Sequence, residues 1–486
     1  MALKFGTSGI RGLVTELTDR EVYLFTTAFL KHAESVGQSL PVAIAEDLRE
    51  SSPQIQKAVC RAISDFGQQI FLCGKIPTPA LAFFAQEKKI LAIMITGSHI
   101  PADRNGIKFY LQTGETLKTD DQHIYEIYSG LKQQSYKKEL FSDSESFLQE
   151  LATAPSIQDV STEAVEVFTK RYLDFFSEKA LLGAKIIVYQ HSSVARDILP
   201  SILEKLGAQI IRLGKTQTFT PVDTEAVEST QVFQEWIREH KADALVSTDG
   251  DGDRPLIVDD QGTVIPGDKV GILTSLFLGI QAIAMPISCN SCAVQMKEFK
   301  KVSITKIGSP YVVEALNILS GQYPLVAGFE ANGGYILESS VDLSASRKLH
   351  KLPTRDSVLP ILCVLIAARE RKTTLSLLLR SLPPRYTCSV LLKNCPTVKS
   401  QNILLMAGRD PAGFLKKMSS EWETEVVDMN ELDGVRLTLK NNDILHFRPS
   451  GNAPEFRCYV ESNTQEKADR LAQIAKKSLQ ELLAQL

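Results

Sequence analysis

The sequence predicts an α/β protein of several layered domains, followed by a C-terminal domain of a different kind. Short apolar runs alternate with stretches of helical periodicity between residues 89 and 321, which is typical of layers with largely parallel sheets. After residue 383 the chain carries strand-like segments in succession and one long amphipathic helix, which indicates a separate α+β domain. The length of 486 residues is enough for about three or four domains.

The first elements of the α/β part follow this alternation. KILAIMITGS (89–98) reads as a buried strand that ends in a polar loop, and AKIIVYQHSS (184–193) is similar. VARDILPSILEKLG (194–207) has helical apolar spacing, and we expect that helix to end at Gly207. AQIIRLG (208–214) is the next predicted strand.

The remaining elements repeat the same order. FQEWIREHKADALVSTDGDGD (233–253) reads as helix, strand and loop, and PLIVDDQGTVIPGD (255–268) as a hairpin that turns at Gln261-Gly262. Two further strands and a helix are predicted at AIAMPISCNS (282–291), KVSITKIGSP (301–310) and YVVEALNILSG (311–321).

The C-terminal part is predicted to be mainly antiparallel. Its strands are SVLLKN (389–394), VRLTLKNNDILHFRPSG (435–451) with a turn at Asn441-Asn442, and FRCYVES (456–462). One amphipathic helix (465–486) follows. The prolines of LPPRY (382–386) make a reasonable linker before this domain.

The amino-acid composition and the net charge limit the classes of partner that we expect. The chain is 44% hydrophobic and 23% charged, as expected of a globular protein, and its net charge of −3 gives no reason to expect nucleic acid or an acidic membrane as partner. The N-terminus has no apolar signal region and no apolar run reaches membrane-spanning length, so we expect a cytoplasmic protein.

The eight cysteines do not form a disulfide framework in a chain of this length. Cys289 and Cys292 form a C-x-x-C, but no second pair or suitably spaced histidines follow to complete a zinc site. We interpret them as small residues that close a strand, with a redox pair as the alternative.

The segment STDGDGDRP (247–255) places three aspartates at alternate positions with glycines between them. Carboxylates this close repel and raise one another's pKa unless a cation is present, and glycine lets the chain curl tightly. Asp249, Asp251 and Asp253 could therefore converge on a hard cation such as Mg²⁺. An EF-hand does not fit, since it needs glycine and glutamate where Arg254 and Asp260 stand. A solvated acidic turn would leave Arg254, which could share a phosphate with the metal, unexplained.

A second polar segment is ITGSHIPADRNGIKFY (95–110), in which Ser98 and His99 follow a predicted strand. Lys108 comes in a second extended piece. Ligands bind at the strand ends of α/β sheets, so this turn is a candidate site. Taken alone, it fits an ordinary Ser/Gly/Pro/Asn loop equally well.

Two further segments offer groups suited to a sugar phosphate. In GFEANGGYILES (328–339), Glu330 and Asn332 can accept and donate hydrogen bonds to vicinal hydroxyls, although glycine-rich turns between strands are common. In RPSGNAPEFR (448–457), an arginine and neighbouring N–H groups can form an anion-binding nest, with a hairpin loop and a structural arginine as the alternative.

These four segments, in this order, resemble the four active-site loops of the α-D-phosphohexomutase superfamily, and the resemblance covers essentially the whole chain. TGSHIPADRNGIK is similar to the catalytic serine motif, DGDGDR to the metal loop, FEAN to the sugar loop and RPSGN to the phosphate loop. KFGTSGIRG and AEDLRESS also match the N-terminal pattern of the superfamily. Four motifs in fixed order with domain-sized gaps are far more specific than any one of them.

The resemblance implies a four-domain architecture, with three related α/β domains containing mixed sheets, a C-terminal α+β domain, and the active site in a central cleft. The expected domains are 1–155 with the serine loop, 156–263 with the metal loop, 264–383 with the sugar loop and 384–486 with the phosphate loop.

The resemblance also implies a mechanism. Ser98 would be a phosphoserine and a ligand of Mg²⁺ together with the three aspartates, and it would give its phosphoryl group to a free hydroxyl of a hexose phosphate. The resulting hexose 1,6-bisphosphate, which is both intermediate and activator, would turn over and return its other phosphate to Ser98. The catalytic candidates are Ser98, His99, Arg11 and, as general base, Lys108. The substrate-binding candidates are Arg254, Lys306, Gly308, Glu330, Asn332, Arg448, Ser450, Gly451 and Asn452.

Some residues depart from the superfamily pattern. Ile100 replaces the usual asparagine, Asn332 stands where serine is common, and Gly334 stands where some members carry histidine. RDS (355–357) departs from a usual R/K-D-G and is given no role. TPVDTEAV (220–227) looks most like bacterial phosphomannomutase-type members. The expected enzyme interconverts hexose 6-phosphate and hexose 1-phosphate, with mannose preferred to glucose and glucosamine third.

Two other classes fit part of the pattern. A non-catalytic sugar-phosphate-binding protein of this fold would have lost Ser98 or Lys108, and neither is lost. A metal-dependent phosphatase of another fold would place a nucleophilic aspartate directly after a strand, as Asp249 is placed, but leaves the serine and phosphate loops unexplained. We expect small-molecule hexose phosphates as partners, neither nucleic acid nor membrane, and a monomer or homodimer.

Overall fold

The computed structural model describes residues 3–6, 8–149, 157–227, 230–344, 347–393, 395–449 and 455–485. The chain divides into two compact units, of which the first contains Met1–Ile283 and Gly308–Leu379. The second contains Ala284–Ile307 and Arg380–Leu486. Each unit is therefore built from two separate stretches of the sequence.

The first sheet of unit 1 is mixed. In spatial order its strands are β1 (Lys4–Phe5), β2 (Ile10–Leu13), β6 (Arg104–Leu111), β5 (Leu91–Ile95), β3 (Val42–Glu46), β4 (Ile70–Gly74) and β8 (Ile157–Asp159), and β7 (Gly114–Glu115) pairs with β6. The strands from β5 to β8 run parallel, whereas β1, β2 and β6 join antiparallel. The mixed sheet implied by the resemblance is confirmed. The largely parallel pairing expected from the apolar runs alone is wrong here, because the polar loop after β5 turns the chain straight back along it.

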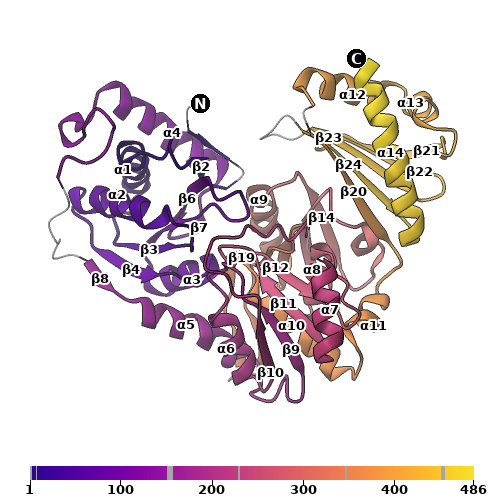
Figure 1. The fold of residues 1–486 in the computed structure, drawn as a ribbon, viewed down its shortest axis with the longest axis horizontal. Helices are drawn as coiled ribbons and strands as arrows, with labels where there is room; N and C mark the ends of the chain where they lie inside the picture. The colour runs from indigo at the N-terminus through magenta and orange to yellow at the C-terminus, as the bar shows by residue number, and fades with distance from the viewer. Residues whose placement is uncertain are drawn as a thin grey trace. The chain divides into compact units, whose positions relative to one another are not determined.

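Helices cover both faces of this sheet, so β3 and β5 are buried along their whole length. Figure 1 shows α1 (Asp19–Ser35) and α2 (Ser52–Asp65) on one side and α3 (Thr78–Lys88) on the other. Helix α4 (Lys118–Gln133) packs beside α1. The Thr18 hydroxyl caps α1 by accepting the Glu21 N–H at 3.3 Å.

The second sheet of unit 1 carries the triple-aspartate loop. Its order is β10 (Gln209–Leu213), β9 (Lys185–Tyr189), β11 (Ala244–Thr248) and β12 (Pro255–Val258), and only the last pair is antiparallel. The aspartates lie in the tight connection between β11 and β12. The helices of this region are α5 (Ser161–Leu173), α6 (Ile198–Lys205), α7 (Thr230–His240) and α8 (Gly267–Phe277).

The predicted helix over 194–207 is shorter than expected at its start. It begins at Ile198, because Val194 donates its N–H to the Gly250 carbonyl in the aspartate loop at 3.1 Å. It ends as predicted, with Gly207 in the left-handed region at φ 95° directly after the C-cap.

The rest of unit 1 contains antiparallel strands and three more helices. Strands β15 (Val326–Phe329), β16 (Tyr335–Leu337) and β19 (Leu352–Asp356) pair in that order, and β17 (Val341–Ser344) pairs with β18 (Arg347–Leu349). The helices are α9 (Ser309–Ser320), α10 (Val358–Glu370) and α11 (Leu375–Arg380). Helix α10 is apolar on nearly every side and correspondingly buried.

Unit 2 contains the predicted α+β domain. Its antiparallel sheet has the order β20 (Tyr386–Leu392), β24 (Phe456–Ser462), β23 (Ile444–Pro449), β22 (Val435–Leu439) and β21 (Val426–Asn430). Helix α14 (Gln465–Gln485) lies against β20 and β24 (Figure 1) and buries Leu471, Ala475 and Leu479 in the core. Two further helices, α12 (Thr397–Arg409) and α13 (Pro411–Met418), and strands β13 (Ala282–Pro286) and β14 (Lys301–Thr305) complete the elements.

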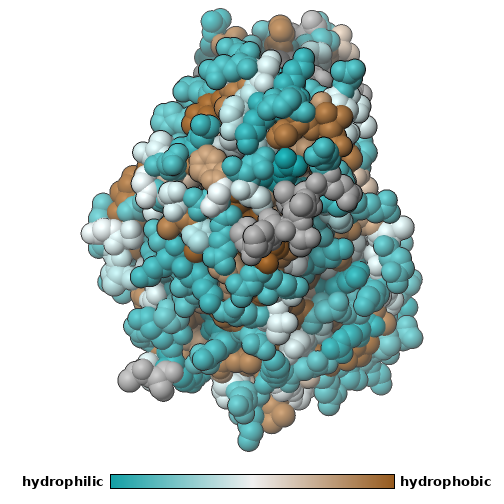
Figure 2. Space-filling view, turned by 90° about the vertical axis from the view of Figure 1, so that its left-hand side faces the viewer, coloured by the Kyte–Doolittle hydropathy of each residue, from teal (hydrophilic) through white to brown (hydrophobic). Residues whose placement is uncertain are grey.

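Among the helices that the structure describes, none is long and apolar enough to cross a bilayer. Figure 2 shows one face on which hydrophilic residues predominate and hydrophobic residues gather only in small separate groups.

Candidate active site

The three aspartates of the loop between β11 and β12 converge, as the sequence predicts. Asp249, Asp251 and Asp253 are all buried, and one carboxylate oxygen from each lies within 4.8 Å of the others. Gly252 has a φ of 72° and donates its N–H to the Asp249 carbonyl at 3.2 Å, so the loop closes on itself.

The chemistry of these carboxylates fits a hard cation. Asp251 Oδ1 and Asp253 Oδ1 are buried and have no hydrogen-bond partner among the described residues. Burial and the neighbouring charges of Asp251 and Asp253 raise the pKa of Asp249 well above its usual range. Three oxygen donors, two of them with free buried atoms, are the set that Mg²⁺ prefers over Zn²⁺.

Ser98 lies directly beside this cluster. It follows β5, is almost completely buried, and donates its hydroxyl to Asp249 Oδ2 at 2.7 Å. Its Oγ is also 3.3 Å from Nδ1 of His99. Two residues 151 positions apart in the chain are thus in contact, which places a nucleophilic hydroxyl next to the candidate metal ligands.

Lys108, on β6, reaches the same carboxylates. Its Nζ donates to Asp251 Oδ2 at 2.6 Å and to Asp253 Oδ2 at 2.7 Å. Burial disfavours the charged ammonium, but the two carboxylates outweigh it and raise the pKa of Lys108. In this arrangement Lys108 is a proton donor, and its predicted role as general base requires it to lose that proton.

A group of positive charges lies on the other side of the cluster. Arg254 NH1 is 2.9 Å from Nδ1 of His99, and its Nε is 3.7 Å from Asp253 Oδ1. Burial and the charges of Arg254 and Arg11 lower the pKa of His99 to about 2, so its imidazole is neutral. Burial and Arg254 also lower the pKa of Arg11 to about 10. Arg254, in contact with His99 beside Ser98, and Arg11, whose charge acts on the same cluster, are groups suited to an anion.

The predicted sugar loop connects β15 to β16. Glu330 and Asn332 are both buried there. Asn332 Oδ1 accepts the Gly334 N–H at 2.9 Å, and the Asn332 carbonyl accepts the Thr224 hydroxyl at 2.8 Å. The Asn332 side-chain oxygen therefore shapes its own loop.

Arg355, to which the sequence analysis gave no role, joins the sugar loop to the metal loop. Its NH2 lies 2.9 Å from Asp253 Oδ2, and its NH1 lies 3.4 Å from Glu330 Oε1. Ser357, two residues on, donates its hydroxyl to the Gly252 carbonyl at 2.6 Å. The segment RDS therefore supports both loops. No local pattern could reveal this, because the partners lie between 25 and 105 positions away in the chain.

Unit 2 contains the other predicted binding residues. Arg448, near the end of β23, pairs through Nε with Asp433 Oδ1 at 2.9 Å. Asp433 Oδ2 accepts the N–H of Ile307 at 2.9 Å, directly after Lys306. Gly308 belongs to unit 1 and caps α9 with a φ of 130°, which suits glycine. The predicted residues Ser450, Gly451 and Asn452 lie outside the described part of the chain.

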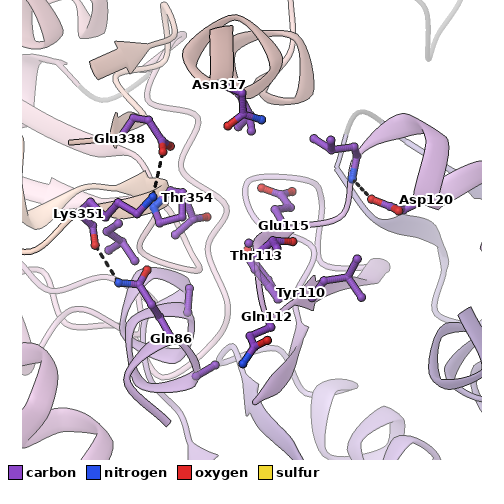
Figure 3. A pocket seen from close by; sticks show the side chains of 18 residues that line it. Gln86, Tyr110, Gln112, Thr113, Glu115, Asp120, Asn317, Glu338, Lys351 and Thr354 are labelled. Atoms are coloured by element: carbon purple, nitrogen blue, oxygen red, sulfur yellow. Dashed lines mark hydrogen bonds and ion pairs between the residues drawn. The ribbon is translucent and has the colours of Figure 1, made fainter. Parts of the chain in front are cut away.

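A cavity of about 460 Å³ lies elsewhere in unit 1. Figure 3 shows Glu115, Asp120 and Glu338 among its labelled residues, with Asn317 from α9 and Lys351, which pairs with Glu338. None of the sequence-predicted site residues lines it. It is a separate polar cavity, not the site around Ser98.

Known domain families and known proteins match the chain over most of its length. Models of the three domains described as "Phosphoglucomutase/phosphomannomutase, alpha/beta/alpha domain" I, II and III match residues 2–135, 166–262 and 266–386. The phosphomannomutase of Salmonella muenchen is 40% identical over 468 residues, which cover 96% of this chain and 93% of that protein.

Solved structures show the same fold. A phosphoglucomutase/phosphomannomutase family protein from Burkholderia thailandensis superposes with a TM-score of 0.74 at 18% identity, covering 98% of this chain and 97% of the other. An N-acetylphosphoglucosamine mutase from Aspergillus fumigatus, solved in complex with GlcNAc-6P and magnesium, gives a TM-score of 0.58 at 13% identity, covering 99% and 96%.

Proposed function

This chain belongs to the phosphoglucomutase/phosphomannomutase family of the α-D-phosphohexomutase superfamily, and from this membership we propose that its substrates are mannose 6-phosphate and mannose 1-phosphate. It is a phosphohexomutase, an isomerase that moves a phosphoryl group between two positions of a hexose. The choice of mannose is supported by the name of the 40% identical relative. The observation that carries the chemistry is the contact of the Ser98 hydroxyl with Asp249 at 2.7 Å.

The metal would be held by Asp249, Asp251, Asp253 and Ser98. The first three form the converging carboxylate cluster, and Ser98 is hydrogen-bonded to it. We propose Mg²⁺, since the donors are oxygens and the fungal relative was solved with magnesium. A divalent cation at this place offsets negative charge on the transferring phosphoryl group.

Ser98 carries the phosphoryl group between the two half-reactions. In the first, its Oγ–P bond breaks as a free sugar hydroxyl forms a new O–P bond, and that hydroxyl gives its proton to Lys108. In the second, the other phosphate of the hexose 1,6-bisphosphate returns to Ser98 Oγ, and Lys108 returns the proton to the sugar oxygen. Lys108 can serve as base only when the Asp251 and Asp253 charges, which hold its proton, are shared with a cation.

The remaining candidates bind the substrate. Arg11 and Arg254 offset charge on the phosphoryl group, His99 orients Ser98 as a neutral imidazole, and Glu330 and Asn332 hold sugar hydroxyls. The residues proposed to bind the non-reacting phosphate, or the part of the substrate next to it, are Lys306, Gly308, Arg448, Ser450, Gly451 and Asn452.

The first test is covalent phosphorylation. Intact mass after incubation with a hexose 1,6-bisphosphate should show one phosphate on the wild-type chain and none on Ser98→Ala, with mutase activity lost in the variant. Ser129→Ala is a matched control, because the Ser129 hydroxyl only donates to the Tyr125 carbonyl within α4. Full activity in Ser98→Ala would rule out the phosphoserine mechanism.

The second test is sugar preference. Steady-state kinetics on mannose 1-phosphate, glucose 1-phosphate and glucosamine 1-phosphate should give the highest kcat/KM for mannose. A higher value for either of the other two sugars would replace mannose in the proposal without affecting the Ser98 chemistry.

We also propose that the enzyme works in the cytoplasm as a monomer or homodimer. No disulfide joins the eight cysteines, all of which lie in the described part of the chain, and this suits a reducing compartment. Light scattering on the purified protein would measure its oligomeric state, and a larger assembly would contradict the proposal.

A further inference from the structure

Ser98 has an unusual backbone that its surroundings must hold in place. Its φ of 54° lies in the left-handed region, which is unfavourable for a residue with a Cβ. Its N–H donates to the Thr96 hydroxyl at 2.7 Å. Its carbonyl, and those of the loop that follows, accept hydrogen bonds from a single side chain, that of Arg49.

The Arg49 guanidinium uses all five of its N–H groups. Nε donates to Asp47 Oδ2 at 3.1 Å. The other four reach carbonyl oxygens of one loop, those of Ser98 at 3.0 Å, Ile100 at 2.6 Å, Pro101 at 2.7 Å and Arg104 at 2.8 Å. A planar fork of donors can satisfy four carbonyls at once only if they converge, so Arg49 fixes the shape of the loop over 98–104.

Asp47 forms hydrogen bonds with the residues at which the same loop begins. Besides Arg49, its carboxylate accepts the Thr96 hydroxyl at 2.8 Å, the Gly97 N–H at 3.3 Å and the Ser52 hydroxyl at 2.7 Å. Asp47 and Arg49 are both buried, where hydrogen bonds are stronger than in water. The pair therefore holds the loop from the end of β5 to the start of β6.

One face of the Arg49 guanidinium is covered by a segment that is distant in the sequence. The ring of Phe219, between β10 and α7, lies with its centroid 4.0 Å from Arg49 Cζ, in a cation–π arrangement. Gly250 of the metal loop approaches the same place, since a Cβ there would lie 2.8 Å from the Ser98 carbonyl oxygen and 3.0 Å from the Phe219 ring. Arg49 thus lies where the serine loop meets the metal loop.

We propose that Arg49 is a positioning residue for phosphoryl transfer, which sets the location and direction of Ser98 Oγ through the backbone carbonyls of the loop. This inference rests on the proposed role of Ser98. Within the described residues, the hydrogen bonds of the Arg49 side chain go only to Asp47 and to the serine loop, so its effect should be concentrated on Ser98 and not spread through the fold.

The decisive variant is Arg49→Lys, which keeps the charge but replaces five fixed donors by three from one point. We expect kcat and the rate of Ser98 phosphorylation by hexose 1,6-bisphosphate to fall roughly 100-fold, because a displacement of about 1 Å is enough for such a loss. KM should change less than about threefold, because Arg49 does not touch the substrate. Guanidinium ion added to Arg49→Ala should restore part of kcat.

Arg385→Lys is the matched control. Arg385 is also buried and paired with a carboxylate, its Nε being 2.6 Å from Glu461 Oε1, but it belongs to unit 2. The Arg385→Lys variant should lower the melting temperature as Arg49→Lys does, while its kcat stays within about threefold of wild type.

If Arg49→Ala does not fold, the Phe219→Ala variant provides an alternative test of the positioning role of Arg49. Loss of the ring should lower kcat roughly 3- to 10-fold in the wild-type background, and by clearly less in Arg49→Lys, because both act on one guanidinium.

Three results would overturn the inference: unchanged kcat in Arg49→Lys, an equal loss in Arg385→Lys at equal stability, or full additivity with Phe219→Ala. A wild-type chain that takes up no phosphate on Ser98 would instead refute the proposed function, and with it this inference. Phosphorylated wild type with an impaired Arg49→Lys supports both.

Discussion

The Lys108 ammonium donates hydrogen bonds to Asp251 and Asp253. These are the same carboxylates that a divalent cation would need as ligands. The ammonium and a cation bound to the same carboxylates repel one another. Both can be present only because each carboxylate has a second oxygen, and those two Oδ1 atoms accept no hydrogen bond from the described residues. We therefore expect the lysine to lower the affinity of the cluster for a metal, while its charge offsets the carboxylates when no metal is bound.

Replacement of Lys108 by methionine should consequently tighten cation binding while it removes mutase activity. We expect the affinity for Mg²⁺ or Mn²⁺ to rise at least about 10-fold, since a positive charge a few ångströms away is lost. Calorimetric titration of the apo protein measures this. Thr78→Val is the control, because it removes a neutral hydrogen bond to Asp251 without changing charge. Weaker binding in Lys108→Met would contradict the repulsion argument.

Asp433 is a second side chain whose effect passes through another residue. It holds Arg448 through Oδ1 and the backbone beside Lys306 through Oδ2, both at 2.9 Å. Asp433→Asn should raise KM for every hexose phosphate by roughly 2- to 12-fold, the equivalent of one ordinary hydrogen bond.

Arg448→Ala should raise KM more, by roughly 10- to 150-fold, because a charge-assisted contact with phosphate is lost. Steady-state kinetics of both variants and of the double variant is the measurement. In the Arg448→Ala background, Asp433→Asn should add little. An undiminished effect there would show that Asp433 does not act through Arg448.

The loops of the candidate site are all attached to rigid strands. Ser98 follows β5, the aspartates follow β11, and Glu330 follows β15. Their close packing depends on residues without side chains, of which Gly250 is the clearest: a Cβ there would lie 2.8 Å from the Ser98 carbonyl oxygen. Because that oxygen belongs to the backbone, it cannot rotate away.

Gly250→Ala should therefore push the metal loop away from the serine loop. We expect kcat to fall more than about 10-fold with the melting temperature little changed, because the shift is confined to two loops. Gly130→Ala is the matched control, since Gly130 lies in α4 with nothing within 4 Å of its added Cβ, and alanine favours a helix. Wild-type kcat in Gly250→Ala would mean that the two loops do not need this close contact.

The sequence allowed the strands and their loops to be predicted, but not how separate loops support one another. The buried runs of β5, β9 and β11 and the glycine-spaced aspartates are local patterns, so the site could be anticipated from them. Arg355 and Arg49 were not identified, because their partners come from other strands and loops. Mixed sheets were implied by the resemblance, but the apolar runs could not show that the pairing becomes antiparallel at β6, since a buried strand has the same composition in either direction.

For the chain as a whole, acid stability should depend on buried histidines outside the candidate site as well as on His99, and one such histidine lies in each unit. Burial lowers the pKa of His191 and of His446 from 6.5 to about 4. Each is neutral when folded, and Nδ1 of each is buried without a partner in the described part of the chain. As the pH falls from about 6.5 to about 4, the unfolded chain binds protons that the folded chain does not, so stability is lost in that window and is full above it.

His446→Gln should flatten this dependence. Each histidine accounts for on the order of 3 kcal/mol between neutral pH and pH 4. Urea unfolding at several pH values should show a smaller decrease for the variant than for wild type. The exposed His123→Gln should behave as wild type. An unchanged slope in His446→Gln would assign the acid sensitivity to other groups.

Unit 2 is built from two separate stretches of the sequence, and this has a consequence for its biosynthesis. Residues 284–307 belong to this unit, and their contacts come from far later in the chain: the Ser291 N–H donates to Glu461 Oε2 at 2.9 Å, and Ile307 to Asp433. At about 5–20 residues per second, a ribosome reaches Glu461 roughly 10 to 35 s after Ser291. During that interval the N–H groups of Ser291 and Ile307 wait for the acceptors that Glu461 and Asp433 provide. A fragment starting at residue 380 would lack this segment altogether, so unit 2 should fold on its own only when both pieces are supplied.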